Sequence, residues 1–200
     1  MAISLEKGHK INLVTSNSNL GEISINFKTP QKKGFIAKFF SPTAVPSSAA
    51  DLDLGCLFEL KNGDRAAVQA LGNGFGSYDE PPYVQLYLDE QIGENLTRET
   101  LRINGDKISE IRRILVYTFI YSDVLSWQNT DITISYPQAE DIIVKLDGYD
   151  CTKNMCGLLL FENIDDTTFS VENIVQFYEG HTFLDEAFNW GINWQTGTND

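Results

Sequence analysis

The sequence is poor in the residues that most often build disulfide, zinc or nucleophilic sites. Its 200 residues include 3 cysteines and 2 histidines. The cysteines, Cys56, Cys151 and Cys156, are odd in number and show no CxxC spacing, which argues against a disulfide framework and a zinc knuckle. Free thiols favour a reducing compartment instead. Cys156 opens the apolar run CGLLLF and is expected in the core, whereas Cys151 is expected to be exposed.

Basic residues are scarce as well. The chain has 15 Lys and Arg against 28 Asp and Glu, which gives a formal net charge of −13 at pH 7. Binding to nucleic acid rests on basic groups that neutralise phosphates, so this balance argues against a nucleic-acid partner. An acidic surface fits either cation binding or a protein kept soluble by self-repulsion.

Long apolar runs are also missing. The N-terminal stretch MAISLEKGHKINLV contains no segment long enough for a signal peptide or a transmembrane segment. We therefore expect a cytoplasmic protein. The length fits a single domain over residues 1–200, with a mobile loop at 41–50 and a frayed tail at 195–200.

The sequence does contain a repeated alternation of apolar and polar residues, which is typical of β-strands with one buried face. In the stretch from Leu52 to Leu60, the apolar residues of even number share one face, while Asp53 and Glu59 fall on the other. The dipeptide Asn62-Gly63 follows and predicts a tight hairpin, with a return strand over 65–71.

Further strands are predicted along the rest of the chain. Their ranges are 23–27, 83–88, 111–121, 132–136, 142–146, 156–161 and 171–178. The run ILVYTFIY (114–121) is apolar on both faces, so it is expected to be a central strand packed on both sides. A late helix is predicted after Thr182, which would cap it with Asp185 three residues on. The pattern predicts an all-β fold, an antiparallel β-sandwich with one or two short helices, one of them near the C-terminus.

Two acidic segments are candidate metal sites. The first holds Asp51 and Asp53, two residues apart on a strand. The second, LDEQIGENLTRE, supplies a larger set of oxygen donors: Asp89, Glu90, Glu94, Asn95 and Glu99. Calcium takes roughly six to eight oxygen ligands, so several such side chains would have to converge from different segments. Neither segment matches an EF-hand loop. The alternative is that both are solvated acidic faces, as in many acidic proteins.

Several motifs, taken in order, resemble one protein family. DLDLGCLFEL, ALGNGFGS, PPYVQL with the acidic turn after it, ILVYTFIY and GHTFLDEAFNWGINW are similar to the bacterial tellurium-resistance and stress-response proteins. Within that group, the chain most resembles the TerA branch of the TerD-like domain family. The resemblance covers nearly the whole chain and implies a single TerD-like β-sandwich that binds calcium through acidic loops at one end. It places Asp51 and Asp53 in the family's Asp-x-Asp motif, and residues 89–99 in its acidic loop. Arg98 adds a positive charge where the family carries glycines and acids.

The resemblance implies a calcium-binding module of the tellurite-resistance and general stress-response system. It would bind calcium ions and other proteins of the same system, and would act by metal-dependent binding or assembly rather than as an enzyme. Two alternatives stay open. One is a metal-free domain that binds a protein or small ligand, with solvated acidic loops. The other is a thiol-dependent enzyme that uses Cys151.

Overall fold

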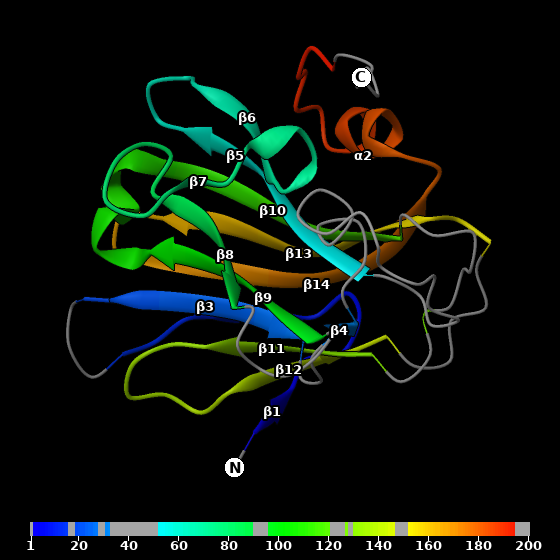
Figure 1. Ribbon diagram of the computed structural model, residues 1–200. Coiled ribbons are helices and arrows are strands. Elements are labelled where there is room, and N and C mark those ends of the chain that lie inside the picture. Colours follow the sequence, from blue (N-terminus) through cyan, green and yellow to red (C-terminus); the bar gives the residue numbers. More distant parts are fainter. Residues whose placement is uncertain are drawn as a thin grey trace.

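The protein is built from two β-sheets packed face to face (Figure 1). The computed structural model describes residues 2–15, 19–27, 31–32, 52–89, 96–120, 127, 130–146 and 152–194, with only the backbone at 31–32, 89 and 96–98. The predicted mobile loop at 41–50 and frayed tail at 195–200 lie outside these residues. Among the described helices, none combines the length and the apolar character that a membrane crossing requires.

The first sheet has eight strands in the described part of the chain, and its order is β1-β12-β11-β3-β9-β8-β7, with β4 paired to β9. Its strands are β1 (Ile3–Ser4), β3 (Glu22–Phe27), β4 (Gln31–Lys32), β7 (Gly76–Ser77), β8 (Val84–Asp89), β9 (Leu96–Asn104), β11 (Asp131–Ser135) and β12 (Ile142–Lys145). Neighbouring strands are antiparallel, except that β1 runs parallel to β12.

The second sheet has six described strands, all antiparallel, in the order β2-β14-β13-β10-β5-β6. These strands are β2 (Lys10–Asn12), β5 (Leu52–Leu60), β6 (Arg65–Gln69), β10 (Ile111–Ile120), β13 (Met155–Ile164) and β14 (Thr168–Tyr178). Two 3₁₀ helices, η1 (Leu71–Asn73) and η2 (Gly105–Glu110), lie in connections, and the α-helix α2 (His181–Ala187) follows β14. The antiparallel sandwich predicted from the alternation is confirmed, and so is the helix near the C-terminus.

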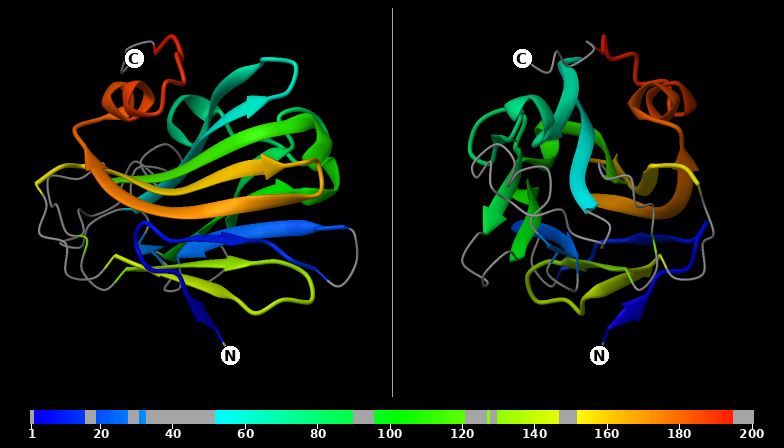
Figure 2. Two further views of the ribbon diagram at one scale, coloured as in Figure 1. Left: turned by 180° about the vertical axis from the view of Figure 1, so that it is seen from behind. Right: turned by 45° about the vertical axis from the view of Figure 1, so that its right-hand side comes forward.

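The core between the sheets follows from the predicted alternation. Inward-facing residues of both sheets, among them Ile25, Leu54, Ile103, Val116 and Phe161, are fully buried in one apolar cluster. Burial of apolar surface on this scale is the main force that holds two sheets together. The view from behind in Figure 2 shows β13 and β14 lying over β3 and β11.

A second apolar cluster covers the outer face of the six-stranded sheet. It joins Leu115, Tyr117 and Phe119 of β10 to Leu184 of α2 and to Trp190 after the helix. The helix lies on this side of the sandwich, away from the eight-stranded sheet (Figure 1). The prediction that the run ILVYTFIY would be packed on both sides is therefore confirmed: β10 lies between β5 and β13 and is buried on both faces.

The one-sided burial predicted for β5 is wrong. Every residue from Leu52 to Leu60 is buried, and the exposed fractions of Asp53 and Glu59 are only 3% and 6%. Alternation within β5 identified the two faces, but it could not show that the segment from α2 to Trp190 packs over the outer one. Tertiary packing therefore decided the burial of this strand.

Two local predictions also need correction. Residues 96–104 form strand β9, although the second acidic segment was treated as a loop up to Glu99. The strand is stabilised by pairing with β3 on one side and β8 on the other. Its polar sequence gives no local signal for this pairing. The helix begins at His181 with Gly180 as the N-cap, so Thr182 lies inside it and makes no cap.

Candidate functional site

The candidate site lies where strands of both sheets end on the same side of the sandwich. Leu52, the first residue of β5, pairs with Ile120, the last residue of β10. In the other sheet, Asp89 at the end of β8 pairs with Arg98 near the start of β9. This end of the molecule therefore collects the segments that carry both predicted acidic clusters.

A side chain from one sheet binds the backbone of the other at this end. The Oε2 atom of Glu99 on β9 accepts a hydrogen bond of 2.5 Å from the backbone N–H of Leu54 on β5. The pairing of β6 with β5 starts only at Gly55, so the backbone of Leu54 lies beyond the end of β6. The carboxylate thus joins the first acidic segment to the second.

Both carboxyl groups at this junction are buried. Asp53 is adjacent to Leu54 and is 3% exposed, and Glu99 is 2% exposed. Removing a carboxylate from water is costly unless hydrogen-bond donors or a cation compensate it. The interpretation of these two residues as solvated surface acids is therefore excluded.

For the other predicted ligands, the structure describes no side chain. The backbone of Asp89 closes β8, while Asp51, Glu90, Glu94 and Asn95 lie outside the described residues. In the described part of the chain, no three His, Cys, Asp or Glu side chains form a group that could hold a metal ion. Asp53 and Glu99 are thus the predicted ligands whose side chains the structure describes. Glu99 faces the core between the sheets, whereas Asp53, the cross-strand partner of Phe119, faces the outer side of β5.

Sequence reasoning missed one polar group near the junction. Thr118 of β10 is fully buried, and its Oγ1 atom has no hydrogen-bond partner in the described part of the structure. It is the cross-strand partner of Leu54, whose N–H binds Glu99. The signal was present in the sequence, because Thr118 is the polar exception within the apolar run ILVYTFIY. The Thr118 side chain faces the core between the sheets, as Glu99 does, whereas Asp53 faces the outer side of β5 with Phe119.

The described thiols are poor candidates for chemistry. Cys56 and Cys156 are both free and buried. Burial raises the pKa of the Cys56 thiol far above its ordinary value, which keeps it protonated and unreactive. The core position expected for Cys156 is confirmed, and Cys151 lies outside the described residues.

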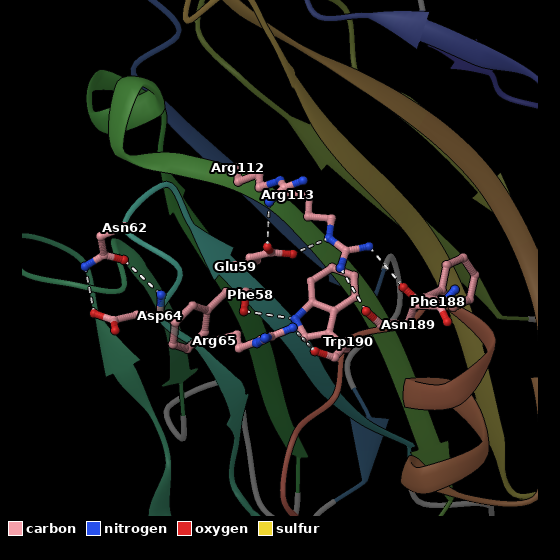
Figure 3. A network of polar contacts seen from close by, with 10 residues as sticks. All are labelled: Phe58, Glu59, Asn62, Asp64, Arg65, Arg112, Arg113, Phe188, Asn189 and Trp190. Atoms are coloured by element: carbon pink, nitrogen blue, oxygen red, sulfur yellow. Dashed lines mark hydrogen bonds and ion pairs between the residues drawn. The ribbon is translucent and has the colours of Figure 1, made fainter.

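A charged network holds the C-terminal segment over β5 and β10 (Figure 3). Glu59 accepts hydrogen bonds from Arg113 Nε at 2.6 Å and from Arg112 Nη1 at 3.0 Å. Arg113 also donates to the carbonyl oxygens of Phe188 and Asn189 at 3.0 and 3.3 Å. These contacts compensate the buried charge of Glu59 and attach the segment after α2 to the sheet.

Trp190 sits at the centre of the same network. Its Nε1 donates to the Phe58 carbonyl at 3.0 Å, and its own carbonyl accepts from Arg65 at 2.6 Å. The guanidinium of Arg113 stacks over the indole at 3.9 Å from the ring centroid. Because Trp190 is fully buried, it belongs to the packing of the sheet and offers no free ligand platform.

Asp185 completes the attachment. It was predicted to serve the start of α2, but its carboxylate accepts hydrogen bonds from the backbone N–H groups of Gly191 and Ile192 and from Trp194 Nε1. The residue therefore ties the helix to the chain that follows it. The candidate functional site is therefore the end of the sandwich where Glu99 accepts a hydrogen bond from the backbone of Leu54.

Comparison with known proteins bears on the family and the fold of the chain. No family profile matches the sequence. The tellurium resistance protein TerA of an Alcaligenes species is 37% identical over 201 residues, which cover 98% of this chain. The chain belongs to the tellurium-resistance family. It spans 58% of the length of that TerA relative.

Two solved structures share the fold of this chain, each with a TM-score of 0.51. One is a protein of unknown function, SAV2460, which is 13% identical, with 81% of this chain and 92% of that chain covered. The other is a homologue of the telluride resistance protein TerD, SCO6318 from Streptomyces coelicolor A3(2), at 14% identity with 83% and 95% covered. At these identities the likeness concerns the fold alone, and it agrees with the sandwich that the sequence motifs implied.

Proposed function

We propose that this tellurium-resistance protein is a calcium-binding module that acts by metal-dependent binding or assembly with other proteins of the same stress-response system. The observation that carries the proposal is the hydrogen bond between Glu99 and the backbone of Leu54, which brings the two acidic segments together beside Asp53. Both carboxyl groups are almost completely buried. A divalent cation bound at this end of the sandwich would neutralise carboxylates of the two acidic segments.

The chemistry of the donors favours calcium over softer metals. Carboxylate and hydroxyl oxygens are hard ligands, which suit calcium and magnesium, whereas copper and zinc prefer imidazole and thiolate. Asp53 and Glu99 carry such oxygens. A bound calcium ion would compensate the negative charge of carboxylates from the acidic segments.

A non-enzymatic role in the cytoplasm is part of the same proposal. The two described thiols, Cys56 and Cys156, are buried, so neither is presented to a substrate. Binding of calcium would instead stabilise the strand ends that meet at the junction. Partners would then recognise the ordered surface at this end of the sandwich.

Thermal unfolding with and without calcium tests the proposal. At a hundredfold excess of calcium over its Kd, binding to the folded state adds about 2.7 kcal/mol. For a chain of 200 residues, this corresponds to a rise in Tm of about 5 to 10 °C over the chelated protein. Asp53→Asn and Glu99→Gln remove a charge with little change in shape, and each is expected to abolish most of the rise.

Asp79→Asn is the matched control. Asp79 is exposed and lies before the start of β8, whereas the proposed site lies near the other end of that strand, at Asp89. This variant is therefore expected to keep the full response. An unchanged Tm of the chelated wild-type protein in millimolar calcium would exclude the calcium site and favour the metal-free alternative.

A further inference from the structure

The sequence contains three Asn-Gly dipeptides, at 62–63, 73–74 and 104–105. This dipeptide readily loses the side-chain amide without an enzyme. Glycine has no Cβ, so its backbone nitrogen can approach the neighbouring amide carbon without hindrance. The local sequence makes the three sites alike in this respect, and a large difference in their reactivity has to come from the fold.

The fold holds the site at Asn104-Gly105 on every reacting group. Asn104 is 6% exposed. Its Nδ2 donates to the Tyr78 carbonyl at 3.0 Å, and its Oδ1 accepts from the backbone N–H of Asp106 at 3.2 Å. The nitrogen of Gly105 is held as well, because it donates to the Gly21 carbonyl at 2.8 Å. Reaction at this site requires these hydrogen bonds to break inside a buried segment.

The site at Asn62-Gly63 is exposed but is also held, in the turn between β5 and β6 (Figure 3). Asn62 Nδ2 donates to Asp64 Oδ2 at 2.8 Å, and its Oδ1 accepts from the backbone N–H of Asp64 at 2.9 Å. The N–H of Gly63 donates to the Leu60 carbonyl at 3.0 Å. Exposure alone therefore does not free this amide to react.

Asn73 differs from both. It ends η1, in the connection between β6 and β7, and its side chain is exposed. No hydrogen bond of its side-chain amide is found in the described part of the structure. Its φ of 58° lies in the left-handed region, so little is lost when the residue leaves this conformation. Gly74 pairs with Gln69 only through an isolated bridge, which opens more easily than a regular ladder.

We propose that Asn73 is a site of spontaneous deamidation, which adds a negative charge to the loop after β6 as the protein ages. The nitrogen of Gly74 attacks Cγ of Asn73, the C–N bond of the side-chain amide breaks, and ammonia leaves with the proton of the attacking N–H. Water then opens the cyclic imide at either carbonyl, which restores the N–H and yields aspartate or isoaspartate. The reaction needs no oxidant, reductant or enzyme, and it is independent of calcium.

Peptide mapping of the folded protein, aged in mildly alkaline buffer at physiological temperature, tests the proposal. Aspartate and isoaspartate are expected to form at position 73 about tenfold or more faster than at 62 or 104, because hydrogen bonds to the amide must first open at those two sites. In the urea-unfolded chain, the three rates are expected to converge, since the same dipeptide then reacts without the fold.

Gly74→Ala is the matched variant. A Cβ at this position has its nearest contact at 3.5 Å, so it fits the loop, yet it hinders the attack by the backbone nitrogen. The variant is expected to react several-fold more slowly at Asn73 and at unchanged rates at Asn62 and Asn104. An unchanged rate at Asn73 in this variant would overturn the attack by the Gly74 nitrogen.

The remaining outcomes decide whether the fold selects the site. Equal rates at 73 and 62 in the folded protein, or an earlier reaction at 62 or 104, would overturn the proposal. A preference for 73 that persists to the same extent in urea would also overturn it, because the preference would then come from the local sequence. No reaction at Asn73 in the folded protein, over a time in which the unfolded chain reacts, would do the same.

Discussion

The histidine at the start of α2 allows a quantitative prediction of how stability changes with pH. The ring of His181 lies against three aromatic rings, at centroid distances of 5.5 Å from Tyr117, 5.4 Å from Phe119 and 4.9 Å from Trp194. Its Nε2 atom is buried and has no hydrogen-bond partner in the described part of the chain. Burial among these rings disfavours the charged imidazolium and lowers the pKa of His181 to about 4.

The direction of the effect follows from the two protonation states. The ordinary pKa of a histidine is 6.5 and that of folded His181 is about 4, so between these values the unfolded chain binds a proton that the folded protein does not. The free energy of unfolding is therefore unaffected by this residue above about pH 6.5 and falls as the pH is lowered toward 4. Between pH 7.5 and pH 5, the expected loss from His181 is about 2 kcal/mol. This is an upper value, because the ring is partly exposed to solvent.

Urea unfolding at pH 7.5 and pH 5 measures this loss. His181→Phe keeps an aromatic ring in the cluster and cannot be protonated, so its loss of stability on acidification is expected to be smaller than that of the wild-type protein by about 2 kcal/mol. Titration of the carboxyl groups contributes to both proteins and cancels in the difference. His9 is exposed, and His9→Phe serves as the control for the same substitution outside the aromatic cluster. Equal pH dependence of His181→Phe and the wild-type protein would refute the reasoning.

Two further substitutions test the packing of the six-stranded sheet by urea unfolding. A Cβ atom at Gly55 would lie 2.6 Å from the ring of Tyr117, so Gly55→Ala is expected to destabilise the protein by about 1–3 kcal/mol, while Gly74→Ala, whose nearest contact is 3.5 Å, should change stability little. Equal stabilities of these two variants would contradict the tight approach at Gly55. Arg113→Ala removes the main partner of a buried carboxylate and is expected to cost about 3 kcal/mol. Arg112, whose side chain is 66% exposed, should cost less than about 1 kcal/mol when replaced by alanine, and the reverse order would refute the network.

Local sequence signals predicted the strands whose residues alternate clearly or are wholly apolar. The hairpin after β5 turns at Asn62-Gly63 as predicted, with Gly63 at a φ of 94°, a conformation that glycine adopts without strain. By contrast, β9 combines charged and polar residues with two core residues, Leu101 and Ile103. Its strand character comes from pairing on both sides, which no local signal carries.

Half of the candidate site could be predicted and half could not. The acidic residues Asp53 and Glu99 were identified from composition and resemblance, since carboxylates are visible in a sequence. Their burial was not, because a polar position on a strand predicts exposure unless another part of the chain covers it. Thr118 was missed because a single hydroxyl in an apolar strand has meaning only when its neighbours in space are known. Binding of calcium itself stays a prediction.

The sequence alone determined the all-β class, the family, and the central position of β10. These follow from side-chain periodicity and from motifs, which are properties of short segments. Only the tertiary structure decided that Glu99 reaches across from one sheet to the backbone of Leu54 in the other. It also decided that the segment after α2 covers β5 through Arg113 and Trp190. The physical reason is that both arrangements join residues at least 45 positions apart in the chain, and such contacts form only when the two sheets pack.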